Sequence, residues 1–111
     1  MRERADTISI GNAPATAGGW SQRELYEIDR IRAVCRKRLQ FESGKSDEGD
    51  PWCIVWDREG ERVMLHIARI DHCYVIAWPS RSVLHRATSI TAATDSALRG
   101  LHEHLRAGHA A

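Results

Sequence analysis

The sequence lacks any apolar run that approaches the roughly 20 residues of a membrane-spanning helix. Its first ten residues, MRERADTISI, are also too polar to form the apolar centre of a secretory signal. We therefore expect a soluble, cytoplasmic protein that has no membrane partner.

An excess of charge of either sign is missing as well. The chain of 111 residues has 16 lysines and arginines against 15 aspartates and glutamates, which gives a formal net charge of +1. Proteins devoted wholly to nucleic acid usually carry a basic surface and a large positive charge. The near-zero balance argues against that class, although it is compatible with a local basic patch.

Cysteine is scarce, and its spacing fits neither a disulfide framework nor a metal centre. The three cysteines, Cys35, Cys53 and Cys73, are an odd number and lack the paired spacing of zinc sites. Cys53 and Cys73 stand among apolar residues, which predicts buried, reduced thiols of the kind found in cytosolic proteins. The six histidines show no ligand spacing either, so we predict no metal site and no cofactor.

What the chain does have is a strand-rich centre at residues 50–79, DPWCIVWDREGERVMLHIARIDHCYVIAWP. Its β-branched and aromatic residues are typical of strands. Gly60 supplies the positive φ of a hairpin turn at Glu59-Gly60, and Asp71 tolerates the left-handed region at Asp71-His72. The segment therefore predicts a three-stranded antiparallel meander, with strands at about 52–57, 62–70 and 73–78.

The two turns predict the register of the meander. The expected opposite pairs are Trp56 with Val63, Ile54 with Leu65, Trp52 with Ile67, and Ile67 with Ile76. Side chains alternate with period two, so one face should carry Trp52, Ile54, Trp56, Val63, Leu65, Ile67, Tyr74, Ile76 and Trp78. The other face should carry Cys53, Val55, Met64, His66, Ala68, Ile70, Cys73, Val75 and Ala77. Both faces are mainly apolar, so the sheet needs a cover on each side.

Helices are predicted on both flanks of the meander. A capping box, Ser21-Gln22-Arg23-Glu24, begins the first, and apolar residues then recur at helical spacing over about 22–38. The second helix is predicted at about 91–106. The fold class is therefore α+β with the element order α-β-β-β-α. Phe41 is a candidate start for one further strand, ahead of a polar loop at 42–50.

The length of the chain suits one domain. We assign residues 20–107 to a single globular α+β domain. Residues 1–19 are rich in small and polar types and are expected to form a disordered or loosely attached tail. Residues 108–111 are expected to form a short C-terminal tail.

Sequence signals for catalysis are weak. No nucleophile elbow, phosphate-binding glycine loop or dinucleotide fingerprint is present. Cys53 and His66 would be neighbours in the predicted register, but a pair at the centre of a covered sheet has no access to substrate. We therefore name no catalytic, cofactor-binding or metal-binding residue, and a small enzyme of unknown reaction is the weakest alternative.

The order helix, three-stranded meander, helix over residues 21–106 is similar to the order of double-stranded RNA-binding domains. The resemblance implies a duplex nucleic-acid-binding module that reads duplex shape through both helices and a loop. The basic residues at the matching places would be Arg36, Lys37, Arg38, Arg81 and Arg86. The dense lysine cluster of that family is absent here, so a solvated basic face is the competing interpretation.

The doubly apolar sheet is the remaining signal. Two helices suffice for one face of three short strands, and an uncovered apolar face of that size usually marks a protein interface. The cover would be the N-terminal segment, a symmetric partner or a different protein; the alternative is a plain monomer with one helix on each face. We predict a small non-enzymatic protein-interaction or regulatory accessory module that forms a homodimer, the commonest self-association. The predicted interface residues are Met64, His66, Ala68, Val75 and Trp52, the last on a free strand edge at 52–56.

Overall fold

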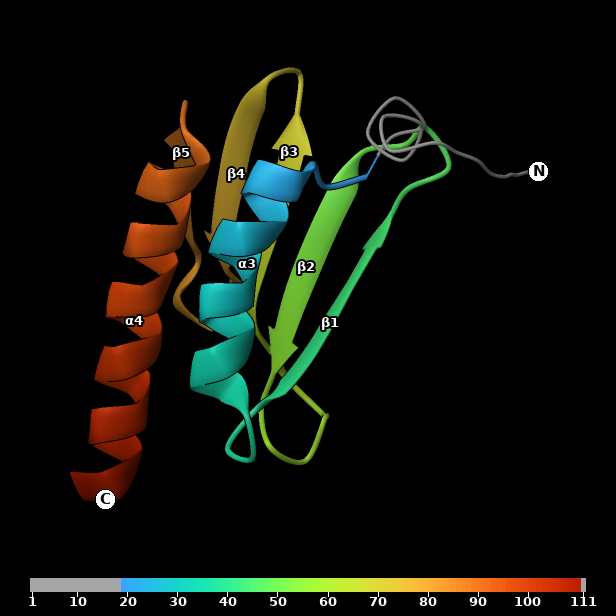
Figure 1. Cartoon of the computed structure of the whole chain (residues 1–111). Coiled ribbons are helices and arrows are strands. Elements are labelled where there is room, and N and C mark those ends of the chain that lie inside the picture. Colours follow the sequence, from blue (N-terminus) through green and yellow to red (C-terminus); the bar gives the residue numbers. More distant parts are fainter. Residues whose placement is uncertain (1–18, 111) are drawn as a thin grey trace.

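The computed structural model describes residues 19–110 of the chain, and the side chains of residues 19–107 (Figure 1). In chain order the elements are α3 (Gln22–Cys35), β1 (Gln40–Lys45), β2 (Pro51–Trp56), β3 (Val63–Ile70), β4 (Cys73–Trp78), the 3₁₀ turn η1 (Pro79–Arg81), β5 (Val83–Ala87) and α4 (Ile90–Ala110). Within the described residues the strands form one antiparallel five-stranded sheet whose spatial order follows the chain. The α+β class and the helix–meander–helix order are confirmed. The predicted tail at 1–19 lies, apart from Gly19, outside the described residues.

The predicted count of three strands is wrong, because β1 and β5 flank the meander as edge strands. Their residues are mostly exposed, and neither segment alternates apolar with polar residues. Strands are recognised in a sequence by the alternation of apolar and polar residues, so these two strands could not be predicted. Part of the expected loop at 42–50 is therefore strand, as the candidate start at Phe41 suggested.

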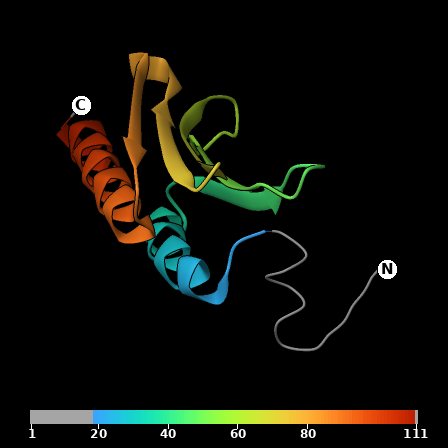
Figure 2. The same ribbon diagram turned by 90° about the horizontal axis from the view of Figure 1, so that it is seen from above.

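The two described helices pack against each other and against one face of the sheet (Figure 2). Ile28 and Ile31 of α3 and Ala97 and Leu101 of α4 are fully buried. They join one core cluster with the inward side chains of β2, β3 and β4, among them Val55, Leu65, Ile67, Ile76 and Trp78. The alternative of one helix on each face is therefore wrong.

The ends of the helices follow from local chemistry. The Ser21 hydroxyl accepts a hydrogen bond from the Glu24 amide, and the Glu24 carboxylate accepts one from the Ser21 amide, which confirms the predicted capping box. The helix ends at Cys35, because Arg36 turns to a positive φ of 34°. The predicted end at residue 38 is thus too late by three residues. In contrast, α4 begins one residue earlier than predicted and continues to Ala110.

A β-bulge between β2 and β3 overturns part of the predicted register. Trp56 faces Val63 as expected, but Val55 then faces Leu65. Met64 is the extra residue, and it shifts every later pair by one position. The β3–β4 pairing is as predicted, with Ile67 opposite Ile76. The bulge therefore moves the side chains of β2 to the face opposite the predicted one, because a shift of one residue turns each side chain to the other side of the sheet. On β3 it also turns Met64 into the core.

The two turns differ in how well the sequence predicts them. Asp71 and His72 have φ values of 51° and 65°, which confirms the tight turn between β3 and β4. Between β2 and β3 the loop spans residues 57–62 instead of two residues, and the Asp57 amide donates to the Arg62 carbonyl over 2.9 Å. Gly60 has the expected positive φ, 75°.

Candidate interaction surface

The sheet face opposite α3 and α4, here called the open face, is lined mainly by apolar side chains. Alternation along the strands assigns it Trp52, Ile54, Trp56, His66, Ala68, Ile70, Cys73, Val75, Ala77 and Leu84. All of these residues are half-buried or exposed, and no element among residues 19–110 packs over them. Contiguous exposed apolar surface is a feature that protein interfaces share.

Cross-strand rows build the centre of the open face. In one row Trp52 pairs with Ala68, and Ala68 pairs with Val75. The adjacent row runs from Ile54 through His66 to Ala77. Small side chains on β3 and β4 therefore lie beside large ones on β2, so the face is uneven.

Trp52 is held in place from two sides. Its indole lies across Gly44 of β1, so that a Cβ at this position would stand 2.7 Å from the Trp52 Cζ2 atom. Its carbonyl accepts a hydrogen bond of 3.3 Å from the Trp20 indole. Gly44 is required for this close approach. The position of this large aromatic side chain on the open face is therefore set by its packing against Gly44.

Charge appears only at the margins of the open face. Glu42 on β1 and Arg86 on β5 alternate to this side, at opposite edges of the described sheet. His66 lies near the centre and is half-buried, and desolvation lowers its pKa. The imidazole is therefore neutral at physiological pH, and the centre of the face is uncharged.

The structure gathers four of the five predicted interface residues. Trp52, His66, Ala68 and Val75 all lie on the open face. Met64 is only 7% exposed and belongs to the core cluster. The predicted free edge at 52–56 is wrong, because β1 pairs along the whole of β2.

The sequence reasoning missed the edge residues Glu42, Leu84 and Arg86 as parts of this face. Leu84 is 58% exposed and is the most exposed large apolar residue of the described strands. The alternation of Val83, His85 and Ala87 toward the helices was the available signal. It was too weak to reveal β5, because only two of these three side chains are apolar.

The residues predicted for duplex binding occupy separate places. Arg36, Lys37 and Arg38 are exposed in the turn after α3. Arg81 borders a groove between β5 and α4, the Arg86 side chain alternates to the open face, and the first three residues do not line that groove. The sheet has five strands within the described residues, so the element order that resembled double-stranded RNA-binding domains no longer holds.

The cysteine and histidine candidates are kept apart by the bulge. Cys53 pairs with Ile67 and faces the helices, whereas His66 lies on the open face. Burial raises the pKa of Cys53 to about 12 and that of Cys35 to about 11, so neither thiol is a ready nucleophile. Cys73 is only half-buried, contrary to expectation. Among the described residues, no three metal-ligating side chains gather in one place.

Known protein families, curated protein sequences and solved structures show no significant match to this chain. Within the described residues, no helix has the length and apolar character to span a membrane.

Proposed function

We propose that this chain is a non-enzymatic interaction module that forms a homodimer, with the open face of one copy packed on that of a second. The observation that carries the proposal is the one-sided cover of the sheet. The two described helices share one face, and the opposite face presents tryptophan, isoleucine, valine and leucine side chains. Burying them against an equal surface removes apolar area from water.

The size of the open face suits a dimer. Five strands about 4.8 Å apart, each with about six residues that rise about 3.3 Å, give a footprint of about 24 by 20 Å. Two such faces bury on the order of 1,000 Å², which is the lower limit for a specific interface. We therefore expect a dimer that dissociates on dilution.

Charge at the edges selects one arrangement. A twofold axis parallel to β3 and between the sheets places β1 of one copy over β5 of the other. Glu42 then approaches Arg86 of the second copy, twice in the dimer. An axis perpendicular to the strands instead places Glu42 near Glu42 of the second copy. Electrostatic complementarity favours the first arrangement.

The test is sedimentation velocity over a range of protein concentrations. The unmodified chain should change from monomer to dimer, whereas Val75→Asp and Leu84→Asp should remain monomeric. Leu84 is the safer of the two substitutions, because its side chain is mostly exposed. The matched control is Tyr26→Asp, a 73% exposed residue on α3, which should still dimerise. A chain that stays monomeric at every concentration, or dimers unaffected by both open-face variants, would contradict the proposal.

A further inference from the structure

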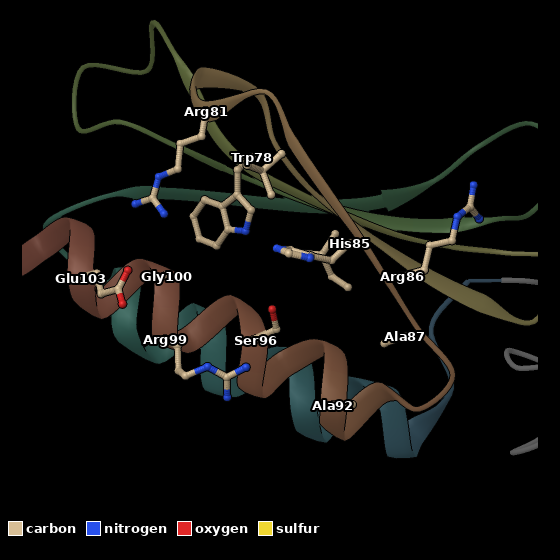
Figure 3. A pocket seen from close by; sticks show the side chains of 12 residues that line it. Trp78, Arg81, His85, Arg86, Ala87, Ala92, Ser96, Arg99, Gly100 and Glu103 are labelled. Carbon is tan, nitrogen blue, oxygen red and sulfur yellow. The ribbon is translucent and has the colours of Figure 1, made fainter.

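A second surface lies on the helix side of the sheet, where β4 and β5 diverge from α4 (Figure 3). It is a groove of about 580 Å³, within the range of small-molecule sites. Val83 and Ala87 form its accessible apolar floor, in front of the almost completely buried Ile76 and Trp78, and α4 forms the facing wall. The groove is separate from the open face, so it does not depend on the proposed dimer.

Small residues keep this groove open. Ala92, Ser96 and Gly100 lie four residues apart on α4 and face the groove. At Gly100 the helix touches Trp78: a Cβ there would stand 2.3 Å from the Trp78 Cζ2 atom. This contact closes one end, and the short side chains of Ser96 and Ala92 leave space along the rest.

The groove carries unpaired positive charge. Arg81 and Arg99 line it with their side chains, whereas the Arg86 side chain points away from α4 (Figure 3). Neither Arg81 nor Arg99 forms an ion pair within the described part of the chain. Other arginines form ion pairs with carboxylates, namely Arg30 with Glu27 and Asp95, Arg32 with Asp29, and Arg69 with Glu24. Among the described residues Glu103 is the only acidic side chain that lines the groove. Its balance of charge therefore favours an anion.

Polar and aromatic groups stand beside these cations. The Arg81 guanidinium lies over the Trp78 ring, 5.1 Å from its centroid, which restricts its orientation. The Ser96 hydroxyl points from α4 into the groove (Figure 3). His85 extends into the same space from β5. Donors are thus available for the hydroxyl groups of a ligand as well as for its charge.

We propose that this groove binds a small organic phosphate with a flat ring, of which a nucleoside monophosphate is the simplest representative. The ring lies against the apolar floor, and the phosphate is held by Arg81 and Arg99 from opposite walls. Ser96 and His85 contact the polar groups between ring and phosphate. Guanidinium groups suit phosphate because they donate two parallel hydrogen bonds.

Isothermal titration calorimetry at low salt with three probes tests the ligand class. AMP should bind, and both adenosine and inorganic phosphate should bind at least about tenfold more weakly, since each lacks one half of the contacts. Equal binding of AMP and inorganic phosphate would overturn the proposal, because it would reduce the groove to a general anion site. Absence of AMP binding would overturn it too.

Variants test the place of binding. Arg81→Gln and Arg99→Gln should each weaken AMP binding about tenfold, the loss expected for one charge-assisted contact. Ser96→Leu should abolish binding by filling the groove. The matched control is Arg58→Gln, an exposed arginine in the β2–β3 loop outside the groove. Circular dichroism confirms that each variant is folded.

If Ser96→Leu fails to fold, the variants Arg81→Gln and Arg99→Gln still test the place of binding. AMP binding that both of these variants retain in full would overturn the proposed site. A mixed duplex RNA that displaces AMP, and whose affinity falls steeply with salt in a manner dependent on Arg81 and Arg99, would also overturn the small-ligand proposal and indicate nucleic acid instead.

Discussion

Glu24 joins the start of α3 to the β3–β4 hairpin through one buried carboxylate. It accepts hydrogen bonds from the Ser21 amide at 2.8 Å, from the Arg69 guanidinium at 2.9 Å and from the Tyr74 hydroxyl. Burial raises the pKa of Glu24, but the Ser21 amide, the Tyr74 hydroxyl and Arg69 outweigh it and hold the pKa below the ordinary 4.5. Burial and the Glu24 carboxylate raise the pKa of Tyr74 to about 12. The carboxylate thus ties the start of α3 to the centre of the sheet.

The substitution Glu24→Gln should lower the free energy of unfolding by about 2 kcal/mol at neutral pH, because it removes the charge from a buried, hydrogen-bonded pair. Urea denaturation measures the difference. The control, Asp29→Asn, breaks the exposed pair with Arg32 and should cost less than about 0.5 kcal/mol. Equal losses in both variants would contradict a special role for Glu24.

The stability difference between the original chain and Glu24→Gln should depend on pH. The folded pKa of Glu24 lies below the unfolded value, so its contribution to stability is complete above pH 4.5 and is lost as the pH falls through the lowered pKa. The stability gap between the original chain and Glu24→Gln should therefore narrow in acid. Urea titrations at neutral and acid pH check this, and a gap that widens in acid would refute it.

Gly100 is the residue at which a usual rule should fail. Glycine to alanine within a helix normally gains about 0.5–1 kcal/mol. Here the new Cβ would overlap the Trp78 ring, so Gly100→Ala should instead cost about 1–3 kcal/mol. Thermal unfolding measures the change. In a Trp78→Leu background the same substitution should cost nothing, and a stabilised single variant would show that the ring yields.

At the scale of elements, the sequence predicted those helices, strands and turns that have a distinct residue pattern. The strands β2, β3 and β4, the Asp71-His72 turn and both helices were accessible, because apolar alternation, turn residues and a capping box mark them. The edge strands were not, since exposed strands have no apolar period. The bulge at Met64 could not be predicted either. Both faces of the meander are mainly apolar, so the pattern of apolar residues fits the register with the bulge as well as the register without it. That ambiguity misplaced Trp52 and Cys53 and separated the predicted Cys53–His66 pair.

The β3–β4 turn offers a prediction about this element. Asp71 and His72 both have positive φ, the geometry for which an asparagine followed by a glycine is the favoured pair. The double substitution Asp71→Asn with His72→Gly should raise stability by about 0.5–1 kcal/mol, because a side chain at positive φ is strained. Thermal unfolding gives the answer. The opposite change, Gly60→Ala at φ 75°, should destabilise the protein, and a destabilised double variant would contradict the turn geometry.

At the scale of the whole molecule, the sheet separates two surfaces of different character. The open face is apolar with charge at its edges, and the groove beside α4 is basic with an apolar floor. The first suits a second copy of the chain, and the second suits a small anion. The two proposals therefore place a small anion and a second copy of the chain on separate surfaces.

Thiol labelling reports on the dimer across the whole molecule. Cys73 is half-exposed on the open face, whereas Cys35 and Cys53 are buried with raised pKa values. Iodoacetamide should therefore modify Cys73 first, and the rate should fall as protein concentration rises. In Leu84→Asp the rate should not depend on concentration. If the original chain also labels at a constant rate while it dimerises, the dimer uses another surface.

The order of the strands has a consequence for how the chain reaches this structure. Each strand pairs with its neighbour in sequence, so every hairpin closes a short loop. Folding rates rise as contacting residues lie closer in the chain. The docking of α3 on α4 is the step that joins distant segments. We therefore expect the hairpins to be formed in the folding transition state, and the two helices to close over the sheet at the end.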